Sequence, residues 1–308
     1  MKVVCLGILV ADVIGRPIDT VPAPGTLQLV PSISPHIGGC AANTGIGLGA
    51  LGIETSVVGK VGRDGFGAFV RDELTSHGVA ARVIEDASAP TSATMVLVGS
   101  NAERAFLHCT GANATLDACD LPADLLDGAD LLHVAGHGLM PRFDGAQCAG
   151  LLRVAQAKGI QTSLDTAGAP DDVWRANLRL CLPHLDFFVP SLHEVGDLFP
   201  DARGPQALAQ KLLEAGVQTV ALKMGKEGSF VSNGRESGFV APFAVEARDA
   251  TGAGDAFAAG FLAGVLRGLD LEDCARLGNA CGALVVTRVG TVAGYRSWNE
   301  TLAWMDSQ

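Results

Sequence analysis

The chain has 308 residues, of which 48% are hydrophobic and 18% charged, and its formal net charge is -11. This composition excludes a disordered chain, and the length is enough for one large α/β domain with a substantial core. The negative charge argues against binding to nucleic acid or to an anionic membrane surface. The 8 scattered cysteines contain no C-x-x-C pair, so we expect reduced thiols in a cytoplasmic protein, without a zinc site or a disulfide framework.

The N-terminal part of the chain predicts a buried strand followed by a departure from the core. Residues 2–6 form a short apolar run, and no G-x-G-x-x-G fingerprint follows it, so a dinucleotide-binding fold is excluded. Frequent prolines mark residues 12–36 as an excursion from the core. The excursion ends at Gly38-Gly39, where a helix of small residues begins and runs to Gly52.

The next part of the chain predicts a hairpin. Residues 55–60 and 82–85 are expected to be strands on either side of a helix, and a turn at 100–103 then separates two runs, 92–99 and 104–110. Both alternating sets of residues in the first run are apolar. We therefore expect one face of the hairpin to cover a ligand and the other face to meet a second subunit.

The second half of the chain alternates between strands and helices. We predict strands near 131–135, 162–165, 187–189 and 219–223, and helices near 144–158, 173–182 and 206–214. Short apolar strands separated by amphipathic helices indicate a mostly parallel sheet that is covered on both faces. A hairpin-like interruption over 225–240 comes next, a helix over 271–286 closes the pattern, and the remaining residues are expected to form a loose tail.

A glycine turn lies directly before an apolar helix. The stretch from Asp249 to Asp255 reads Asp-Ala-Thr-Gly-Ala-Gly-Asp. Gly252 and Gly254 have no Cβ atoms, so consecutive N–H groups can converge at the positive end of the helix dipole and hold an anion. A carboxylate beside such a phosphate cradle is what the general base of a phosphoryl transfer needs. For Asp255 taken alone, the simpler alternative is an acidic residue favoured by the helix dipole.

Two further observations bear on how a nucleotide and a substrate would be held. A Walker A loop is absent, because Gly225-Lys226 is followed by Glu227. Asn43 lies one turn into the helix that follows Gly38-Gly39. Taken alone, this asparagine is most simply interpreted as a local cap or a local hydrogen bond.

With Gly38-Gly39-x-x-x-Asn43 early and Asp249-x-Thr251-Gly252-x-Gly254-Asp255 late, the chain resembles the ribokinase-like (PfkB) carbohydrate kinases over nearly its full length. The resemblance implies a three-layer α/β/α fold with a central, mostly parallel sheet. It also implies one kinase domain over 1–308, with a small, discontinuous β lid formed by about 12–36 and 92–111.

The resemblance implies that ATP, with Mg²⁺, phosphorylates a hydroxyl, usually a primary one, of a monosaccharide or related polyol. Asp255 would take the proton from the attacking hydroxyl. The main-chain N–H groups of Gly252, Ala253 and Gly254 would neutralise the charge that develops on the transferred group. The substrate-binding positions that match are Asp12, Gly38, Gly39, Asn43 and Asp255.

The resemblance also assigns nucleotide and metal positions. The nucleotide positions are Ser191, Lys223, Gly225, Gly228, Gly252, Gly254 and Asn279. Glu194 matches the acidic residue of an Asn-x-x-Glu motif that orients Mg²⁺ largely through water, and Ser191 in place of the Asn predicts a weaker or rearranged Mg²⁺ shell. The residues that match a monovalent-cation loop, K⁺ in many relatives, are Asp249, Thr251, Val285, Arg288 and Gly290. Only Asp249 supplies a side-chain charge, so the loop can equally be empty.

Two other functions remain open at this point. A nucleoside kinase on the same fold usually sandwiches a base between aromatic rings, whereas this chain is only 5% aromatic. A sugar-binding protein without catalysis is less consistent with the intact Asp255 and its glycine turn. We expect a small-molecule sugar and ATP as partners, no nucleic acid, no membrane, and a second copy of the chain bound through the lid.

Overall fold

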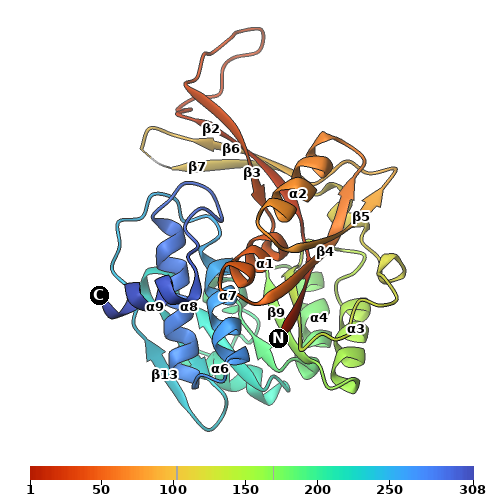
Figure 1. The fold of residues 1–308 in the computed structure, drawn as a ribbon, viewed down its shortest axis with the longest axis vertical. Helices are drawn as coiled ribbons and strands as arrows, with labels where there is room; N and C mark the ends of the chain where they lie inside the picture. The colour runs from red at the N-terminus through yellow and green to blue at the C-terminus, as the bar shows by residue number, and fades with distance from the viewer. Residues whose placement is uncertain (102, 169) are drawn as a thin grey trace.

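The computed structural model describes residues 1–101, 103–168 and 170–308. Its body is a nine-stranded sheet in the order β13-β12-β11-β10-β9-β8-β1-β4-β5, and helices cover both faces (Figure 1). From β11 to β5 all neighbouring strands run parallel, and β12 and β13 form an antiparallel edge hairpin. The strands are β1 (Lys2–Gly7), β4 (Glu54–Gly62), β5 (Ala80–Asp86), β8 (Leu131–His137), β9 (Gln161–Thr166), β10 (Phe187–Phe188), β11 (Thr219–Lys223), β12 (Ser229–Ser232) and β13 (Ser237–Val240).

The central strands are apolar without alternation because helices bury both faces of the sheet. In β1, Val3 and Cys5 belong to the core on one face, and Val4 and Leu6 belong to the core on the other. The predicted three-layer α/β/α architecture is confirmed.

The helices divide between these two cores. On the first face lie α1 (Cys40–Ala50), α2 (Gly65–Ser76), α7 (Ala253–Leu266), α8 (Leu271–Val286) and α9 (Trp298–Asp306). On the second face lie α3 (Ala146–Ala157), α4 (Asp172–Cys181), α5 (Leu192–Val195) and α6 (Gly204–Glu214). Short 3-10 turns are η1 (Gly111–Thr115), η2 (Ala118–Asp120), η3 (Leu182–His184) and η4 (Gly225–Glu227). The described helices are all too short or too polar to span a bilayer.

A second, four-stranded sheet, called the small sheet below, projects from the body (Figure 1). Its order is β3-β2-β6-β7, with bounds β2 (Val10–Arg16), β3 (Ser32–Gly38), β6 (Ala93–Val98) and β7 (Arg104–Cys109). The ends of the proline-rich excursion therefore pair with the predicted hairpin. In the predicted turn at 100–103, Ala102 lies outside the described residues. One register line crosses all four strands and joins His36, Asp12, Thr94 and His108.

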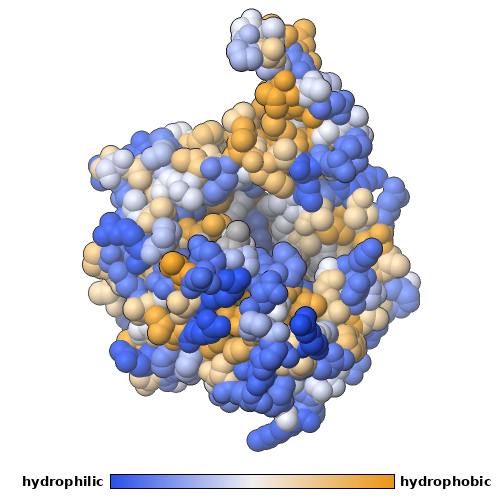
Figure 2. Space-filling view, turned by 180° about the vertical axis from the view of Figure 1, so that it is seen from behind, coloured by the Kyte–Doolittle hydropathy of each residue, from blue (hydrophilic) through white to orange (hydrophobic). Residues whose placement is uncertain are grey.

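The two faces of the small sheet differ in burial. Thr94 and Val96 are buried on the face that carries Asp12, whereas Met95 and Leu107 on the opposite face are 53% and 61% exposed. Apolar side chains gather on this projecting part of the surface, and the molecule is hollowed beneath it (Figure 2). The hairpin thus covers a hollow on one side and presents an open apolar face on the other.

The prediction of a loose C-terminal tail is wrong, because residues Trp298–Asp306 form α9. The Ser297 side chain accepts a hydrogen bond from the Glu300 N–H, and the Glu300 carboxylate accepts one from the Ser297 N–H at 3.0 Å. The Arg267 guanidinium lies 4.0 Å from the centroid of the Trp298 ring. The Ser-x-x-Glu spacing of this capping box was a readable signal for a helix start.

Candidate active site

The turn before α7 has a backbone that requires glycine. Gly252 is the N-cap of α7 with φ +78°, and a Cβ there would lie 2.7 Å from the Thr291 carbonyl oxygen. A Cβ on Gly254 would lie 3.1 Å from Lys223 Nζ. Because an α-helix leaves its first N–H groups without partners inside the helix, this end of α7 can bind an anion. The predicted glycine turn at a helix mouth is therefore present, with an ammonium group beside it.

Asp255 lies in the first turn of α7 and is buried. Its Oδ2 accepts a hydrogen bond from Asn43 Nδ2 at 2.7 Å. Burial raises the pKa of Asp255, and the Asn43 bond and the charge of Lys223 oppose this rise. Asn43 Oδ1 is also buried and has no hydrogen-bond partner among the described residues. The local interpretation of Asn43 is therefore wrong, and its free acceptor suits a ligand hydroxyl.

Asp12, on β2, approaches the start of α1 closely. A Cβ on Gly38 would lie 2.1 Å from Asp12 Oδ2, and one on Gly39 would lie 2.4 Å from the Ile8 carbonyl oxygen. Burial raises the pKa of Asp12 to about 6; a hydrogen bond from Thr94 lowers it, and the charges of Asp249 and Asp255 add to the rise. The two glycines are thus required for the small sheet to place a carboxylate beside α1.

The C-terminal part of the chain holds α1 and the end of β3 in place. Tyr295 Oη donates a hydrogen bond to the Asn43 carbonyl oxygen at 2.9 Å, and Thr291 Oγ1 donates one to the Ile37 carbonyl oxygen at 2.7 Å. A Cβ on Gly47 would lie 2.5 Å from Tyr295 Cζ. These contacts leave α1 little freedom to turn Asn43 away from Asp255.

A buried ion pair lies at the carboxyl ends of the parallel strands. Lys223 Nζ, at the end of β11, is 2.5 Å from Asp165 Oδ2 near the end of β9. Burial alone would lower the pKa of Lys223, but Asp165 and Glu194 raise it, so the lysine stays charged. Asp165 is not among the predicted site residues, although a carboxylate that closes an apolar strand is a signal for a site at this edge of a sheet.

Glu194 is held by two donors. Its Oε2 accepts from Thr166 Oγ1 at 2.8 Å and from the Ser191 N–H at 3.2 Å. In the described part of the chain, no group of three His, Cys, Asp or Glu side chains is arranged to hold a metal. A single fixed carboxylate fits Mg²⁺, which is usually bound by one or two carboxylates, water and phosphate oxygens.

The nucleotide positions line a second glycine turn. Gly225 begins η4 and Gly228 directly follows its end, with φ +59° and +86°. A Cβ on Gly228 would lie 2.2 Å from the Val240 carbonyl oxygen. Asn279 Nδ2 donates to the carbonyl oxygens of Val240 and Ala241 at 3.1 and 3.0 Å. The amide nitrogen of Asn279 therefore fixes the loop after β13, and contact with the adenine remains a prediction.

An arginine of the small sheet lies beside the predicted cation loop. Arg104 of β7, which is not among the predicted site residues, places Nη1 2.7 Å from Asp249 Oδ1. Asp249 also accepts from the N–H groups of Thr251 and Gly290, each at 3.0 Å. Arg104 opens the second run of the predicted hairpin, and only the fold brings it to this loop.

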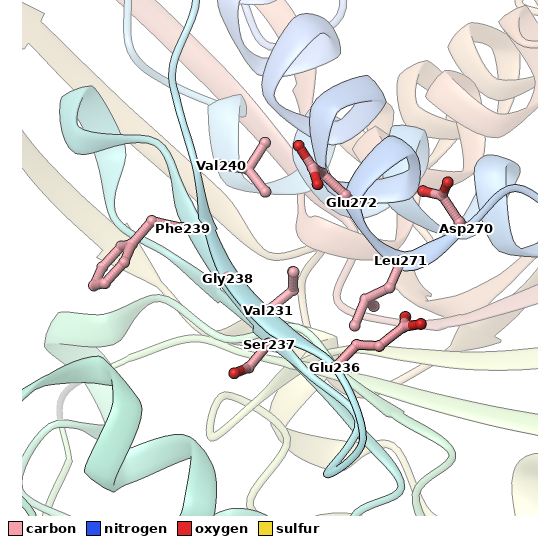
Figure 3. A pocket seen from close by; sticks show the side chains of 9 residues that line it. All are labelled: Val231, Glu236, Ser237, Gly238, Phe239, Val240, Asp270, Leu271 and Glu272. Carbon is pink, nitrogen blue, oxygen red and sulfur yellow. The ribbon is translucent and has the colours of Figure 1, made fainter.

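A separate cavity of about 290 Å³ lies between the β12–β13 hairpin and the start of α8 (Figure 3). Three carboxylates line it, from Glu236, Asp270 and Glu272. A triphosphate would be repelled there, so this cavity does not compete with the α7 turn as a phosphate site.

The fold and the site are those of a phosphotransferase: a glycine turn at a helix mouth, a buried carboxylate and an ammonium group are what a phosphoryl transfer needs. Comparison of the chain with known proteins supports the same class. Residues 1–298 match the model of the pfkB family carbohydrate kinases. A 2-dehydro-3-deoxygluconokinase of Bacillus subtilis is 29% identical over 297 residues, covering 92% of this chain and 91% of that protein. A nucleoside kinase of Methanothermobacter thermautotrophicus is 30% identical over 281 residues, covering 89% of this chain and 86% of that protein.

A solved structure of a ribokinase II from E. coli in complex with ATP and Mg²⁺ superposes with a TM-score of 0.88 at 25% identity, covering 100% of this chain and 99% of that chain. The chain belongs to the PfkB family of carbohydrate kinases. It is an ATP- and Mg²⁺-dependent phosphotransferase with an alcohol group as acceptor.

Proposed function

We propose that the protein transfers the γ-phosphate of ATP to a primary hydroxyl of a monosaccharide or related polyol. The observation that carries the proposal is the buried Asp255 carboxylate at the mouth of α7, held by Asn43 at 2.7 Å. Its raised pKa makes the carboxylate a better proton acceptor than an exposed aspartate.

The proposed reaction uses these groups in one step. Asp255 takes the proton of the substrate hydroxyl while that oxygen attacks the γ-phosphorus, and the bond to the bridging oxygen breaks to release ADP. The N–H groups of Gly252, Ala253 and Gly254 hold the charge that develops on the transferred group. The Lys223 ammonium lies against Gly254 and adds a positive charge there. Mg²⁺, held through water by Glu194, would supply neutralisation of the β- and γ-phosphate charges.

The small sheet would act as a lid that selects the acceptor. Its register line supplies the side chains of His36, Asp12, Thr94 and His108, which can donate to and accept from several hydroxyls. The name of the Bacillus subtilis relative supports a sugar-type acceptor. A nucleoside is the second candidate, because Phe106 lies two residues before His108 on the same face of β7 and offers a ring to a base.

A coupled ADP-release assay over pentoses, hexoses, keto-deoxy sugar acids and nucleosides tests the acceptor class. We expect turnover with a sugar or sugar acid, and none in the Asp255→Asn variant with the same acceptor. Turnover with nucleosides alone would select the second candidate. A wild-type protein that binds ATP but turns over no acceptor of either class would contradict the proposed function.

We also propose that two copies pair through the open face of the small sheet and that the protein works in the cytoplasm. The exposed Met95 and Leu107 lie on neighbouring strands of that face, directly opposite each other. Pairing would remove them from water. Leu107→Glu should convert a dimer at micromolar concentration into a monomer in light scattering. A monomeric wild-type protein would refute the pairing.

The cysteines support the proposed location in the cytoplasm. All 8 are free, which suits a reducing compartment.

A further inference from the structure

The Asp249 carboxylate, at the start of the glycine turn, is saturated with donors. Oδ1 accepts from Arg104 Nη1 at 2.7 Å, from the Thr251 N–H at 3.0 Å and from Thr251 Oγ1 at 2.7 Å. Oδ2 accepts from the Gly290 N–H at 3.0 Å. Burial raises the pKa of Asp249, but these bonds and the charge of Arg104 lower it below its ordinary value. Asp249 is thus a charged group whose counter-ion comes from the small sheet.

This arrangement does not fit a monovalent cation bound to the same carboxylate. A cation beside Asp249 would face a guanidinium that already lies within hydrogen-bond distance of Oδ1, and like charges repel at such a separation. The Val285 carbonyl, a second predicted ligand, accepts the Arg288 N–H at 3.1 Å at the end of α8. The one carboxylate of the predicted cation loop is therefore already paired with a cation from the chain itself.

The Arg104 contact joins two regions that are distant in the sequence. Arg104 and Asp249 are 145 residues apart, one on the last strand of the small sheet and the other three residues before Gly252. Arg104 also donates to the Thr251 hydroxyl, and Thr251 directly precedes the N-cap of α7. A planar guanidinium that bonds two neighbouring groups fixes their orientation as well as their charge. The side chain of Asp249 is 10% exposed and that of Arg104 26%, so water screens the pair only in part.

We propose that Arg104 takes the place of a monovalent cation at Asp249 and orders the glycine turn only while the small sheet lies over the site. Arg104 is then a positioning residue, because it acts on the phosphate cradle through Asp249 and Thr251. The inference rests on the proposed phosphoryl transfer at that cradle. It follows that catalysis does not require K⁺, and that movement of the small sheet away from the body loosens the cradle.

The first test compares wild-type rates in potassium, sodium and tetramethylammonium chloride at one ionic strength. We expect the three rates to agree within about twofold, because the charge is supplied by the chain. Activation by potassium of about fivefold or more, the lower end of ordinary coupling between two ligands, would overturn the proposal.

The second test replaces Arg104 and uses Arg16, an exposed arginine of the same sheet, as the matched control. Arg104→Ala should lower kcat by roughly tenfold to a hundredfold, as expected for loss of charge-assisted hydrogen bonds, with a smaller change in the KM of the acceptor. K⁺ or guanidinium ion at non-denaturing concentration should restore part of the rate. Arg104→Lys keeps the charge but loses the paired N–H donors of the guanidinium, so its kcat should lie between those of the wild type and Arg104→Ala. Arg16→Ala should match the wild type.

A third measurement does not depend on turnover. Hydrogen–deuterium exchange over residues 249–256 should be faster in Arg104→Ala than in Arg16→Ala, with similar exchange in β1 and β8 of both. Equal exchange over 249–256 in the two variants, or an unchanged kcat in Arg104→Ala, would overturn the role of Arg104. A wild-type protein without kinase activity would instead contradict the proposed function, and the exchange comparison would still test the contact.

Discussion

The turn before α7 and the small sheet build the same site in different ways. In the turn, main-chain N–H groups and the buried Asp255 and Asn43 leave almost no freedom, since added Cβ atoms would meet backbone or buried side chains. The small sheet contributes side chains on strands that have one open face, and Arg104 connects this sheet to the turn. In the proposed mechanism the two parts have separate tasks: the turn carries the phosphoryl chemistry, and the small sheet selects and covers the acceptor.

Asp255→Asn should have the largest effect of the substitutions considered, because it changes the carboxylate in the first turn of α7. Loss of the proposed general base should lower kcat by roughly 10²–10⁴-fold, with the KM for ATP nearly unchanged. The fold should be retained, because burial disfavours the charge that the substitution removes. Steady-state kinetics and thermal unfolding measure both effects. Turnover close to wild type would show that another group accepts the proton.

The ion pair of Lys223 with Asp165 should give the next largest effect. Lys223→Met leaves a buried carboxylate without its partner and should destabilise the fold by about 3–5 kcal/mol. The double variant Lys223→Met/Asp165→Asn should regain most of this stability without regaining ATP affinity. Calorimetric binding of ATP and of ADP to the double variant separates the two contributions. If ATP binds more weakly while ADP does not, Lys223 acts on the γ-phosphate; equal affinities for ATP in wild type and double variant would make the pair purely structural.

Asp12 of β2 tests how the small sheet contributes to binding of the acceptor. Its pKa is raised from 3.8 to about 6, so the carboxyl gains a proton as pH falls through 6 and loses acceptor capacity for hydroxyls. The KM for the acceptor should therefore rise below pH 6 in the wild type and stay flat in Asp12→Asn.

The same pKa has a consequence for stability. Because the folded pKa is the higher one, the wild type loses stability relative to Asp12→Asn as pH rises from 3.8 through 6. At pH 8 the variant should be more stable by up to about 3 kcal/mol, and the difference should vanish near pH 4. Denaturant unfolding at the two pH values checks this. A constant difference between the two proteins would exclude a raised pKa.

Ser191→Asn should have the smallest effect. An amide at this position would offer a longer donor and acceptor beside Glu194, so the Mg²⁺ concentration for half-maximal rate should fall by about twofold to fivefold, as for changes in outer-sphere contacts. Ser191→Ala is the control for loss of the hydroxyl. Identical Mg²⁺ titrations for all three proteins would show that this position does not influence the metal shell.

Much of the body could be predicted because its physical causes are local. Strands buried on both faces are apolar runs, and glycines mark the turns where a Cβ has no room, as at Gly38 and Gly252. The helix α9 was overlooked although Ser297 and Glu300 signalled its start.

The remaining parts of the site depend on contacts between distant segments. Asp165 and Lys223 are 58 residues apart, and Arg104 and Asp249 are 145 apart. No pattern in a single sequence shows which strands become neighbours in a sheet or where a second sheet docks. The chemistry of a site can thus be predicted from its motif, whereas its counter-charges follow from topology.

Tyr295 makes the position of Asn43 depend on a distant part of the chain. Its hydroxyl donates a hydrogen bond to the Asn43 carbonyl oxygen across 252 residues of sequence. Local unfolding of the segment that carries Tyr295 would therefore loosen α1, and with it the hydrogen bond from Asn43 to Asp255, while the central sheet stays folded.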